Sequence, residues 1–519
     1  MDNNIGLFLT KRAHLNPDLE GFIDDASGAR LTFGAINATC NRTANMLRQL
    51  GLAKGERVAL LMLNCPEFLE SFMGVAKIGG VVVPLNIRLV ADELAFILRD
   101  SGAKVLIFGA EFAEVVADLS SRGADATHVE HWIYVAAPGD GGPERAPFAT
   151  DYHTLQAAAP AAEPALGARD DDMLYIMYTS GTTGLPKGVV HTHTTAIWAC
   201  ITLAATATME FKDRFLMMLP AYHVGALTPF TVNVYRGITS VLMRHFDPLR
   251  AWELIDEEEI DVTLAVPAML LFMSQVPDLD RFRHERLRWI MSGGAPVPVT
   301  LIEAFAALGV EVNEVYGLTE CCGPACLIGP DDALVRRGST GKAFFHTDIR
   351  VVDETGSDVA PDRTGEVLVR GRHVMKEYWN QPEATAKTIR DGWLHTGDLA
   401  TMDADGFVYI KDRTTDMIIS GGENVYPAEI ENVLLAHPKV REAAVIGQPS
   451  AKWGESALAV VVAADETLQA DDVLGHCIGK LARFKLPQAV AFVDEIPRNP
   501  TGKILKHRLR EKFPGPAAD

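Results

Sequence analysis

Short apolar runs alternate with amphipathic stretches through much of the chain. Runs such as 57–63 (RVALLML) and 81–84 (VVVP) have the length and the β-branched content of buried strands. The stretches 68–78 and 92–101 place apolar residues at helical spacing. Because strands and helices of this length alternate, the pattern predicts parallel sheets covered by helices on both faces.

The same alternation returns in the middle of the chain. Strands are predicted at 104–108, 214–219, 262–266, 289–292 and 312–315, and helices at 248–258, 267–275 and 299–308. After about residue 351 short strands with turns predominate, and the chain then ends in strands at 443–447 and 457–462 and a helix at 471–482. Two segments rich in Ala, Pro and Gly, 136–147 and 157–168, are predicted surface loops. The expected class is α/β with a small α+β domain at the C-terminal end.

Composition narrows the class of protein. The chain has 519 residues, which at ~150 residues per domain predicts about three to four folding units. A content of 48% hydrophobic and 22% charged residues excludes a disordered chain. The net charge of −20 argues against nucleic acid as the main partner, because phosphate backbones need a positive face. A small anionic ligand in a locally basic pocket is still allowed.

Cysteine usage and the N-terminus predict a cytoplasmic protein. The seven cysteines include no C-x-x-C pair, which favours reduced thiols. The N-terminal sequence MDNNIGLFLTKR lacks the charge pattern of a signal peptide. The stretch 215–235 has no formal charge, but Pro220 and Pro229 interrupt it, so a buried strand-and-loop segment is expected rather than a membrane span.

The most informative motif is YTSGTTGLPKG at 178–188, directly after a predicted strand at 174–177. Its glycines allow close backbone approach, its hydroxyls donate hydrogen bonds, and Lys187 supplies a positive charge. It differs from a Walker A loop because Pro186 precedes the lysine. In isolation such a segment could be a flexible surface loop, but its composition favours phosphate binding.

Two further motifs follow predicted strands. GGAP at 293–296 has the form of an ordinary strand-to-helix turn and is weak alone, while YGLTE at 316–320 places an aromatic ring where a base could stack. Glu320 could reach a metal ion, and ligands of α/β sheets bind beyond the carboxyl ends of strands. A buried structural tyrosine with a surface glutamate is the alternative interpretation.

Two motifs nearer the C-terminus each carry one candidate residue. In HTGD at 395–398, the Asp398 carboxylate suits a vicinal diol such as that of ribose, and Arg413 in IKDR could brace it. In PRNPTGK at 497–503, Pro and Gly present Lys503 at a loop tip. Each could be an ordinary surface residue by itself. Together the five motifs form a set that suits activation of a carboxylate by ATP, with loss of pyrophosphate.

The same motifs, with the hinge segment IKDRTTDMIISGGENVYPAEIE, resemble the acyl-adenylate-forming superfamily, and within it the bacterial acyl-CoA synthetases (fatty-acid–CoA ligases). The resemblance runs from about position 80 to PTGK. It implies an N-terminal domain of two αβ-layered sheets plus a small β-barrel-like piece, over residues 1–413. It also implies a hinge at 414–416 and a mobile C-terminal domain at 417–519.

The resemblance also implies a role for individual residues and three small molecules: ATP, Mg²⁺ and CoA. The phosphates of ATP are expected at Thr179, Ser180, Gly181, Thr182, Thr183, Gly184 and Lys187, and the adenine at Gly294, Ala295, Tyr316 and Gly317. Thr319 is expected to contact phosphate, Glu320 to bind Mg²⁺, and Asp398 with Arg413 to hold the ribose. Lys503 is expected to bridge the carboxylate and the α-phosphate, and His223 to gate the acyl pocket beside the acyl carbonyl. Gly421, Gly422 and Trp453 are expected to line the CoA tunnel.

The acyl pocket is expected to be apolar. The residues expected to line it are His223, Val224, Thr228, Val266, Gly293, Gly317, Leu318 and Cys322, which lack the polar groups that an amino acid would require. This composition favours a medium- or long-chain fatty acid, with an aryl acid such as a hydroxycinnamate or benzoate as the second option. At the hinge the chain departs from the family pattern, because Thr415 replaces the usual charged residue. A β-branched residue is stiffer, so the energetics of the hinge are expected to differ.

The first hypothesis is an ATP-dependent CoA ligase that makes acyl-AMP and then acyl-CoA. An enzyme that loads a carrier protein and a luciferase-like oxygenase on the same scaffold stay open; a requirement for CoA in AMP release would distinguish the first. Apart from the acid, ATP and CoA, no nucleic-acid partner and no transmembrane segment are expected. Peripheral membrane contact stays open, and the sequence does not decide the oligomeric state, for which a homodimer is one option.

Overall fold

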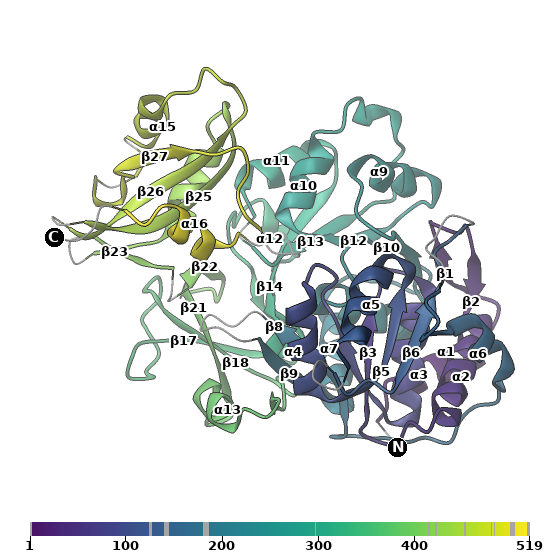
Figure 1. The fold of residues 1–519 in the computed structure, drawn as a ribbon. Coiled ribbons are helices and arrows are strands. Elements are labelled where there is room, and N and C mark those ends of the chain that lie inside the picture. The colour runs from purple at the N-terminus through teal and green to yellow at the C-terminus, as the bar shows by residue number, and fades with distance from the viewer. Residues whose placement is uncertain are drawn as a thin grey trace.

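The computed structural model describes residues 3–123, 127–139, 145–179, 186–295, 297–413, 416–420, 423–450, 453–478, 480–481, 483–498 and 504–515. A large N-terminal domain, coloured purple to teal in Figure 1, carries two sheets with helices packed around them. A small antiparallel sheet, coloured green, follows it, and a smaller C-terminal domain, coloured yellow-green to yellow, lies above that sheet in the view and beside the teal part of the large domain.

The first large sheet has the spatial order β19-β9-β8-β4-β3-β5-β6-β7. Its strands are β3 (Arg57–Leu61), β4 (Val81–Pro84), β5 (Ala103–Gly109), β6 (His131–Val135), β7 (Thr150–Asp151), β8 (Met173–Thr179), β9 (Lys187–Thr192) and β19 (Glu377–Tyr378). The strands β8, β4, β3, β5, β6 and β7 pair with their neighbours in the parallel sense. The pairs β8–β9 and β9–β19 are antiparallel.

The second large sheet has the order β16-β15-β14-β13-β12-β10-β11-β1-β2. Its strands are β1 (Glu20–Asp24), β2 (Arg30–Thr32), β10 (Arg214–Met217), β11 (Thr239–Leu242), β12 (Val262–Ala265), β13 (Trp289–Gly293), β14 (Glu311–Leu318), β15 (Gly323–Leu327) and β16 (Lys342–Ala343). Its central strands are parallel, whereas β2, β15 and β16 are antiparallel. The expectation of parallel sheets therefore holds for the centres and is wrong at the edges, where β2, β9, β15, β16 and β19 pair in the antiparallel sense.

Helices connect these strands and cover the sheets. They are α1 (Gly6–Leu15), α2 (Phe33–Gln49), α3 (Pro66–Ile78), α4 (Ala91–Ser101), α5 (Ala113–Ser121), α6 (Tyr152–Ala158), α7 (His193–Thr206), α8 (Val224–Arg236), α9 (Pro248–Glu257), α10 (Pro267–Ser274), α11 (Val299–Ala307), α12 (Pro330–Ala333) and α13 (Pro382–Thr388). The helix α3 shows how local chemistry sets its ends, with Pro66 at its first position and Gly79 after its last. Gly79 has φ of 82°, and a Cβ there would lie 2.7 Å from the backbone of Gly167, so glycine is required.

The green sheet consists of β17 (Asp348–Val352), β18 (Gly365–Arg370), β20 (Ile389–Arg390), β21 (Trp393–Met402) and β22 (Val408–Arg413). All of its pairings are antiparallel, and it corresponds to the small β-barrel-like piece expected from the resemblance. The C-terminal domain is built on β23 (Ile418–Ser420), β24 (Glu423–Val425), β25 (Val440–Ser450), β26 (Gly454–Ala463) and β27 (Ala489–Phe492). The helices α14 (Pro427–Leu435), α15 (Ala470–Cys477) and α16 (Lys506–Lys512) complete it. The helix predicted at 471–482 corresponds to α15, which ends five residues earlier than predicted.

The segment 157–168, predicted as a surface loop, is tied to the large domain by a buried charge. The Lys77 ammonium on α3 donates to Asn37 (2.7 Å), Asn41 (2.6 Å) and Glu163 (2.8 Å) while its side chain is 1% exposed. A buried ammonium is tolerated only with such a full set of acceptors. Lys77 therefore attaches this segment to the helices α2 and α3.

The uncharged stretch 215–235 forms β10, a short connection and most of α8. The strand part of the prediction is confirmed. Most of the predicted loop is instead the helix α8, which contains Pro229 in its interior. Among the described residues, the structure holds no helix with the length and apolar content needed to cross a membrane.

Candidate functional site

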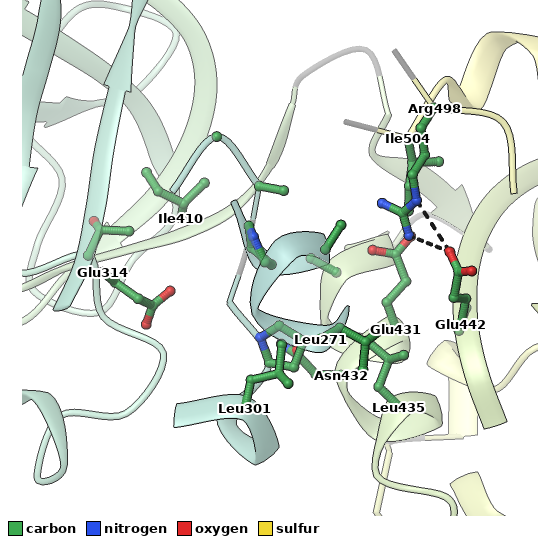
Figure 2. Close-up of a pocket in the computed structure, with 18 of the residues that line it drawn as sticks. Leu271, Leu301, Glu314, Ile410, Glu431, Asn432, Leu435, Glu442, Arg498 and Ile504 are labelled. Carbon is green, nitrogen blue, oxygen red and sulfur yellow. Dashed lines mark hydrogen bonds and ion pairs between the residues drawn. The ribbon is translucent and has the colours of Figure 1, made fainter. Parts of the chain in front are cut away.

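A cavity of about 330 Å³ lies between the large domain and the C-terminal domain. Figure 2 shows its two walls, with Glu314, Ile410, Leu271 and Leu301 on one side and α14 with Arg498 on the other. Among the residues singled out from the sequence, it is lined by Gly294, Ala295, Tyr316, Gly317, Leu318 and Asp398. Three motifs that lie far apart in the chain therefore meet at one cavity.

Tyr316 and Asp398 are joined directly. The Tyr316 hydroxyl on β14 donates to Asp398 Oδ2 on β21 at 2.6 Å, and both side chains are almost completely buried. Burial, together with the negative charge of Asp398, raises the pKa of Tyr316, so the phenol stays protonated and keeps this bond. The bond fixes the Tyr316 ring beside the Asp398 carboxylate. β22 pairs its Arg413 backbone with Asp398, and the side chain of Arg413 lies outside the described residues.

Two glycines in this region leave no room for a side chain. A Cβ at Gly293 would lie 2.1 Å from the Val315 carbonyl oxygen, and one at Gly317 would lie 1.6 Å from the Gly323 carbonyl oxygen. Contacts this short are forbidden, so the close packing of β13, β14 and β15 depends on glycine. Gly294, which follows β13, has φ of 81° and opens the turn that carries Ala295 into the cavity wall.

Tyr378 on β19 brings together two residues that the sequence could only treat separately. Its hydroxyl donates to Glu320 Oε1 at 2.9 Å, and the Lys187 ammonium lies 5.0 Å from the centre of its ring. Lys187 begins β9 opposite Thr179 at the end of β8, so the strand pair presents the two ends of the predicted phosphate loop. Residues 180–185, which include Ser180, Gly181, Thr182, Thr183 and Gly184, lie outside the described residues.

A buried histidine, His191, forms a hydrogen bond with the backbone of the YGLTE segment. His191 Nε2 donates to the Thr319 carbonyl oxygen at 2.7 Å, and its Nδ1 lies 3.0 Å from the Thr195 hydroxyl. Burial lowers the pKa of His191 to about 4, so the ring is neutral and keeps this arrangement at physiological pH. Thr319 and Glu320 form the short helical turn η4 (Thr319–Cys321), directly after the cavity-lining Leu318.

Most of the predicted acyl-pocket residues do not line this cavity, although Val266 lies next to the cavity-lining Gly294. Val224, Val266 and Cys322 belong to, or pack against, one apolar cluster, and the Thr228 hydroxyl donates to the Cys322 carbonyl oxygen at 2.7 Å. His223, directly before α8, has a buried Nε2 atom without a hydrogen-bond partner among the described residues. Burial lowers the pKa of His223 to about 4, so it is a neutral group. Leu318, by contrast, packs with Tyr316 in another cluster.

The predicted CoA and hinge residues are mostly outside the described part of the chain. These are Gly421, Gly422 and Thr415, and the predicted catalytic residue Lys503 also lies outside the described part. Trp453 is described, stands directly before β26 and is 44% exposed. It does not line the cavity of Figure 2.

Sequence reasoning missed the cavity wall that the C-terminal domain provides. It includes Glu431 on α14, Glu442 on β25, and Arg498 and Ile504, which flank residues 499–503. Arg498 pairs with Glu442 at 2.7 Å, as the dashed lines in Figure 2 show. No pattern in the sequence singles out these residues, because their contact depends on how the C-terminal domain folds.

Glu314 is a second residue that the sequence did not indicate. It lies on β14 two residues before Tyr316, lines the cavity and is 5% exposed. Burial raises the pKa of Glu314 to about 8, although the backbone N–H groups of Val297 and Gly338 donate to its carboxyl group. Glu314 therefore links Val297 to the backbone at Gly338. Below about pH 8 it does so as an uncharged carboxylic acid.

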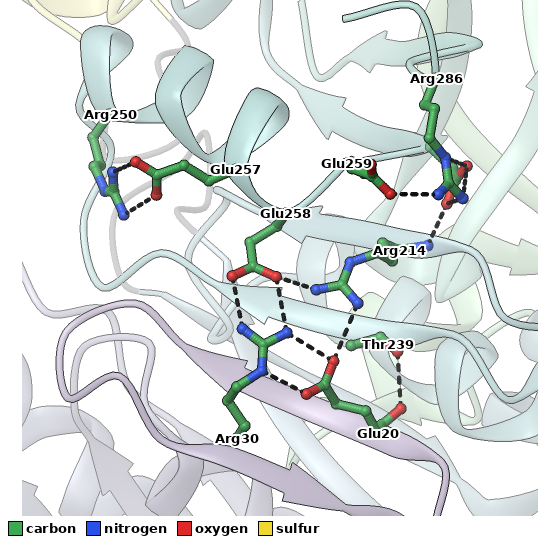
Figure 3. Close-up of polar contacts among 10 residues, drawn as sticks. Glu20, Arg30, Arg214, Thr239, Arg250, Glu257, Glu258, Glu259 and Arg286 are labelled. Atoms are coloured by element: carbon green, nitrogen blue, oxygen red, sulfur yellow. Dashed lines mark hydrogen bonds and ion pairs between the residues drawn. The ribbon is translucent and has the colours of Figure 1, made fainter. Parts of the chain in front are cut away.

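Another cluster of charged residues lies away from the cavity and belongs to the fold. Arg30 on β2 pairs with Glu20 (2.7 Å) and Glu258 (2.8 Å), and Arg214 on β10 contacts the same two carboxylates (Figure 3). The cluster joins β1 and the edge strand β2 to the end of α9. Each guanidinium has carboxylate partners, so the arrangement is a structural tie between elements.

Comparison with known proteins agrees with this geometry. The family model described as AMP-binding enzyme matches residues 9–379, and that of the AMP-binding enzyme C-terminal domain matches residues 429–503. The chain is 46% identical over 510 residues to the long-chain-fatty-acid–CoA ligase FadD13 of Mycobacterium tuberculosis, covering 98% of each.

Solved structures agree with the fold over the full length. A Mycobacterium tuberculosis fatty acyl CoA synthetase is 44% identical, with a TM-score of 0.79 and 98% of each chain covered. The anthranilate CoA ligase AuaEII in complex with anthranoyl-AMP is 26% identical, with a TM-score of 0.91, covering 99% of this chain and 97% of the other. Since the family models match residues 9–379 and 429–503 and a full-length relative is 46% identical, the chain belongs to the AMP-binding enzyme family.

Proposed function

We propose that this protein is an ATP-dependent acyl-CoA ligase. It converts a carboxylic acid and ATP to acyl-AMP and pyrophosphate, and CoA then displaces AMP to give acyl-CoA. The proposal is supported by full-length similarity to acid–CoA ligases and by the motif residues that meet around one cavity.

The observation that carries the proposal is that both domains line the cavity that holds Tyr316 and Asp398. Arg498 and Ile504, on either side of residues 499–503, face the same cavity. A nucleotide bound against Tyr316 and Asp398 would therefore share the cavity with Arg498 and Ile504, which precede and follow the segment of Lys503 in the chain. This arrangement suits the first half-reaction, in which a lysine neutralises charge between the carboxylate and the α-phosphate.

Each part of the chain then has a defined task. Asp398, held by the Tyr316 hydroxyl, accepts hydrogen bonds from the ribose diol. Lys187 and the residues of the predicted phosphate loop bind the β- and γ-phosphates. The neutral His223 lies beside the acyl carbonyl and excludes water from the reacting carboxylate until CoA enters.

A magnesium ion would fit at Glu320. Its Oε1 atom is held by Tyr378, which orients the carboxylate, and Mg²⁺ is commonly bound through one or two carboxylates with the phosphates of a nucleotide. Among the described residues, no group of three or more His, Cys, Asp and Glu side chains forms a metal site by itself. Bound there, the ion would neutralise the charge of the pyrophosphate that leaves.

We propose a medium- or long-chain fatty acid as the substrate. The described acyl-pocket residues Val224, Val266 and Cys322 are apolar or weakly polar and pack with an apolar cluster. The relative with 46% identity is a long-chain-fatty-acid–CoA ligase, whereas the anthranilate ligase, which acts on an aryl acid, is 26% identical. An aryl acid is the second candidate. A panel of fatty and aryl acids assayed with ATP, in the presence and in the absence of CoA, decides the acid and the thiol acceptor.

The variant Lys503→Ala tests the two-step mechanism. Pyrophosphate release from ATP and acid should fall by ~10²–10³, since loss of a positioned charge in the transition state costs on the order of 3–4 kcal/mol. Thioester formation from synthetic acyl-AMP and CoA should stay close to the wild-type rate. Lys439→Ala, an exposed lysine of the same domain, is the matched control and should change neither step. An equal loss of both steps would contradict the assignment of Lys503 to the first half-reaction.

A further inference from the structure

Three neighbouring strands, β8, β9 and β19, carry residues assigned above to the phosphates of ATP on one face of their sheet. Thr179 on β8 lies opposite Lys187 on β9, and Tyr378 on β19 lies opposite Val189, two residues after Lys187. Residues that are directly opposite share a face of the sheet, and so do residues two apart along one strand. Lys187 and Tyr378 therefore share a face. On it the Lys187 ammonium lies over the Tyr378 ring, whose hydroxyl donates to Glu320.

The opposite face of the same strands is covered by two aromatic side chains that flank Gly188. Tyr178 lies opposite Gly188, and the Trp379 N–H donates to the Gly188 carbonyl oxygen at 2.7 Å. A Cβ at Gly188 would lie 3.1 Å from the Tyr178 ring and 3.2 Å from Trp379 Cβ. Tyr178 and Trp379 pack against one apolar cluster, whereas Val189 and Tyr378 belong to another. The two clusters lie on the two faces, so the phosphate side and its support are separated by the sheet.

Both aromatic side chains donate to a single residue near the end of α4. The Tyr178 hydroxyl donates to Asp100 Oδ2 at 2.5 Å, and Trp379 Nε1 donates to the Asp100 carbonyl oxygen at 2.8 Å. The last four carbonyl groups of a helix have no partner within it, so the Asp100 carbonyl is open to an outside donor. Burial and the Asp100 carboxylate raise the pKa of Tyr178, so its hydroxyl stays protonated and keeps donating. Asp100 therefore attaches both neighbours of Gly188 to α4.

An arginine fixes the same helix end. Arg57 on β3 donates from Nε to the Ser101 carbonyl oxygen at 2.5 Å and from Nη1 to the Gly55 carbonyl oxygen at 3.1 Å. Its guanidinium lies 5.7 Å from the centre of the Trp379 ring. β3 is an inner strand of the sheet, between β4 and β5. Asp100 is therefore held by the centre of the large domain, which makes it a firm point of attachment.

We propose that Asp100 is a positioning residue for the β- and γ-phosphates of ATP. The inference rests on the proposed function and adds to it a residue that acts through the two aromatic side chains rather than on the substrate. By holding them on one face of the sheet, Asp100 fixes the strands whose other face carries Lys187 and Tyr378, and Tyr378 in turn holds Glu320. Loss of the Asp100 carboxylate weakens the contacts with the two outer phosphates and spares the contacts with the rest of the nucleotide.

Equilibrium binding of ATP and of AMP to the full-length Asp100→Ala variant tests this role. In isothermal titration calorimetry with Mg²⁺ and without an acid, ATP should bind about 10-fold more weakly than to wild type, as when a partner that orients a binding group is lost. AMP, which lacks the two outer phosphates, should bind as tightly as to wild type, which also shows that the variant is folded. Asp118→Ala, which removes the exposed Asp118–Arg122 ion pair of α5 (2.6 Å), is the matched control and should bind both nucleotides normally.

The two half-reactions give an independent measurement. With dodecanoate and ATP, pyrophosphate release by Asp100→Ala should fall by about 10- to 100-fold, the range expected when binding groups are misplaced by about 1 Å. Thioester formation from dodecanoyl-AMP and CoA should keep the wild-type rate, because the outer phosphates take no part in it. Equal losses of ATP and AMP binding, or of the two half-reactions, would show that Asp100 only supports the fold and would overturn the inference.

A double-mutant cycle assigns the effect to the hydrogen bond. Tyr178→Phe keeps the ring and removes the hydroxyl, so it should weaken ATP binding as Asp100→Ala does, and the double variant should lose no more than either single variant. Asp100→Asn keeps an oxygen that accepts from Tyr178 and should regain most of the lost affinity. A Tyr178→Phe variant that binds ATP as tightly as wild type would overturn the inference.

The outcomes also separate this inference from the proposed function. If the wild-type enzyme releases no pyrophosphate with any acid of the panel, the proposed function fails. If the wild-type enzyme is active and Asp100→Ala matches it in ATP binding and in both half-reactions, the proposed function stands and only the positioning role is overturned.

Discussion

Glu314 provides a test of how the cavity wall is held together. Its carboxyl group is 5% exposed, and burial raises its pKa from an ordinary value of 4.5 to about 8. Between these two values the folded chain keeps a proton that the unfolded chain has lost. The free energy of unfolding therefore falls as the pH rises through this window, and the loss is complete above pH 8.

The magnitude follows from the size of the shift. One pKa unit corresponds to 1.36 kcal/mol, so the contribution of Glu314 changes by about 1.4 kcal/mol per pH unit, or about 4 kcal/mol between pH 5 and pH 8. The variant Glu314→Gln keeps the size of the side chain and an acceptor for the Val297 N–H, and it has no proton to lose. Its stability relative to wild type should therefore rise by about 4 kcal/mol from pH 5 to pH 8.

The assay is urea-induced unfolding of both proteins at pH 5, 6.5 and 8, followed by tryptophan fluorescence. Comparing variant with wild type at each pH cancels the titration of all other groups. Glu285→Gln, which removes an exposed carboxylate between β12 and β13, is the control and should show a difference that does not depend on pH. A constant difference between Glu314→Gln and wild type over this range would refute the reasoning that burial keeps Glu314 protonated.

Three further predictions concern the nucleotide site, the hinge and the fold. Asp398→Ala should raise the KM for ATP, because loss of the ribose contact costs roughly 1.5–3 kcal/mol; an unchanged KM in steady-state kinetics would remove Asp398 from the site. Thr415→Pro should leave acyl-AMP formation nearly intact and slow thioester formation, since proline fixes φ at the hinge; single-turnover rates of the two steps check this, and equal losses would argue against a hinge. Glu258→Gln should lower the free energy of unfolding by about 1–2 kcal/mol, because Arg30 and Arg214 lose a shared carboxylate (Figure 3); urea unfolding that matches wild type would mean that Glu20 alone suffices.

Local sequence patterns determined the central elements of this protein. The strands predicted at 57–63 and 81–84 correspond to β3 and β4, and the helix predicted at 267–275 corresponds to α10, because hydrophobic periodicity and terminal Pro and Gly residues act within a few positions. The motif residues that carry the family resemblance also came from short segments. Tyr316 and Asp398 were both identified in this way, each with a weak signal of its own.

Only the tertiary structure decided how these residues act together. The Tyr316–Asp398 hydrogen bond, the Lys187–Tyr378–Glu320 arrangement and the raised pKa of Glu314 depend on contacts between strands that are far apart in the chain. The same is true of the Arg498–Glu442 pair, whose partners lie on different elements of the C-terminal domain. Periodicity reports which face of an element is buried, but it carries no information about which distant side chain or charge will lie against that face. That choice is made when the sheets and the two domains pack, since burial and neighbouring charges then set hydrogen bonds and protonation.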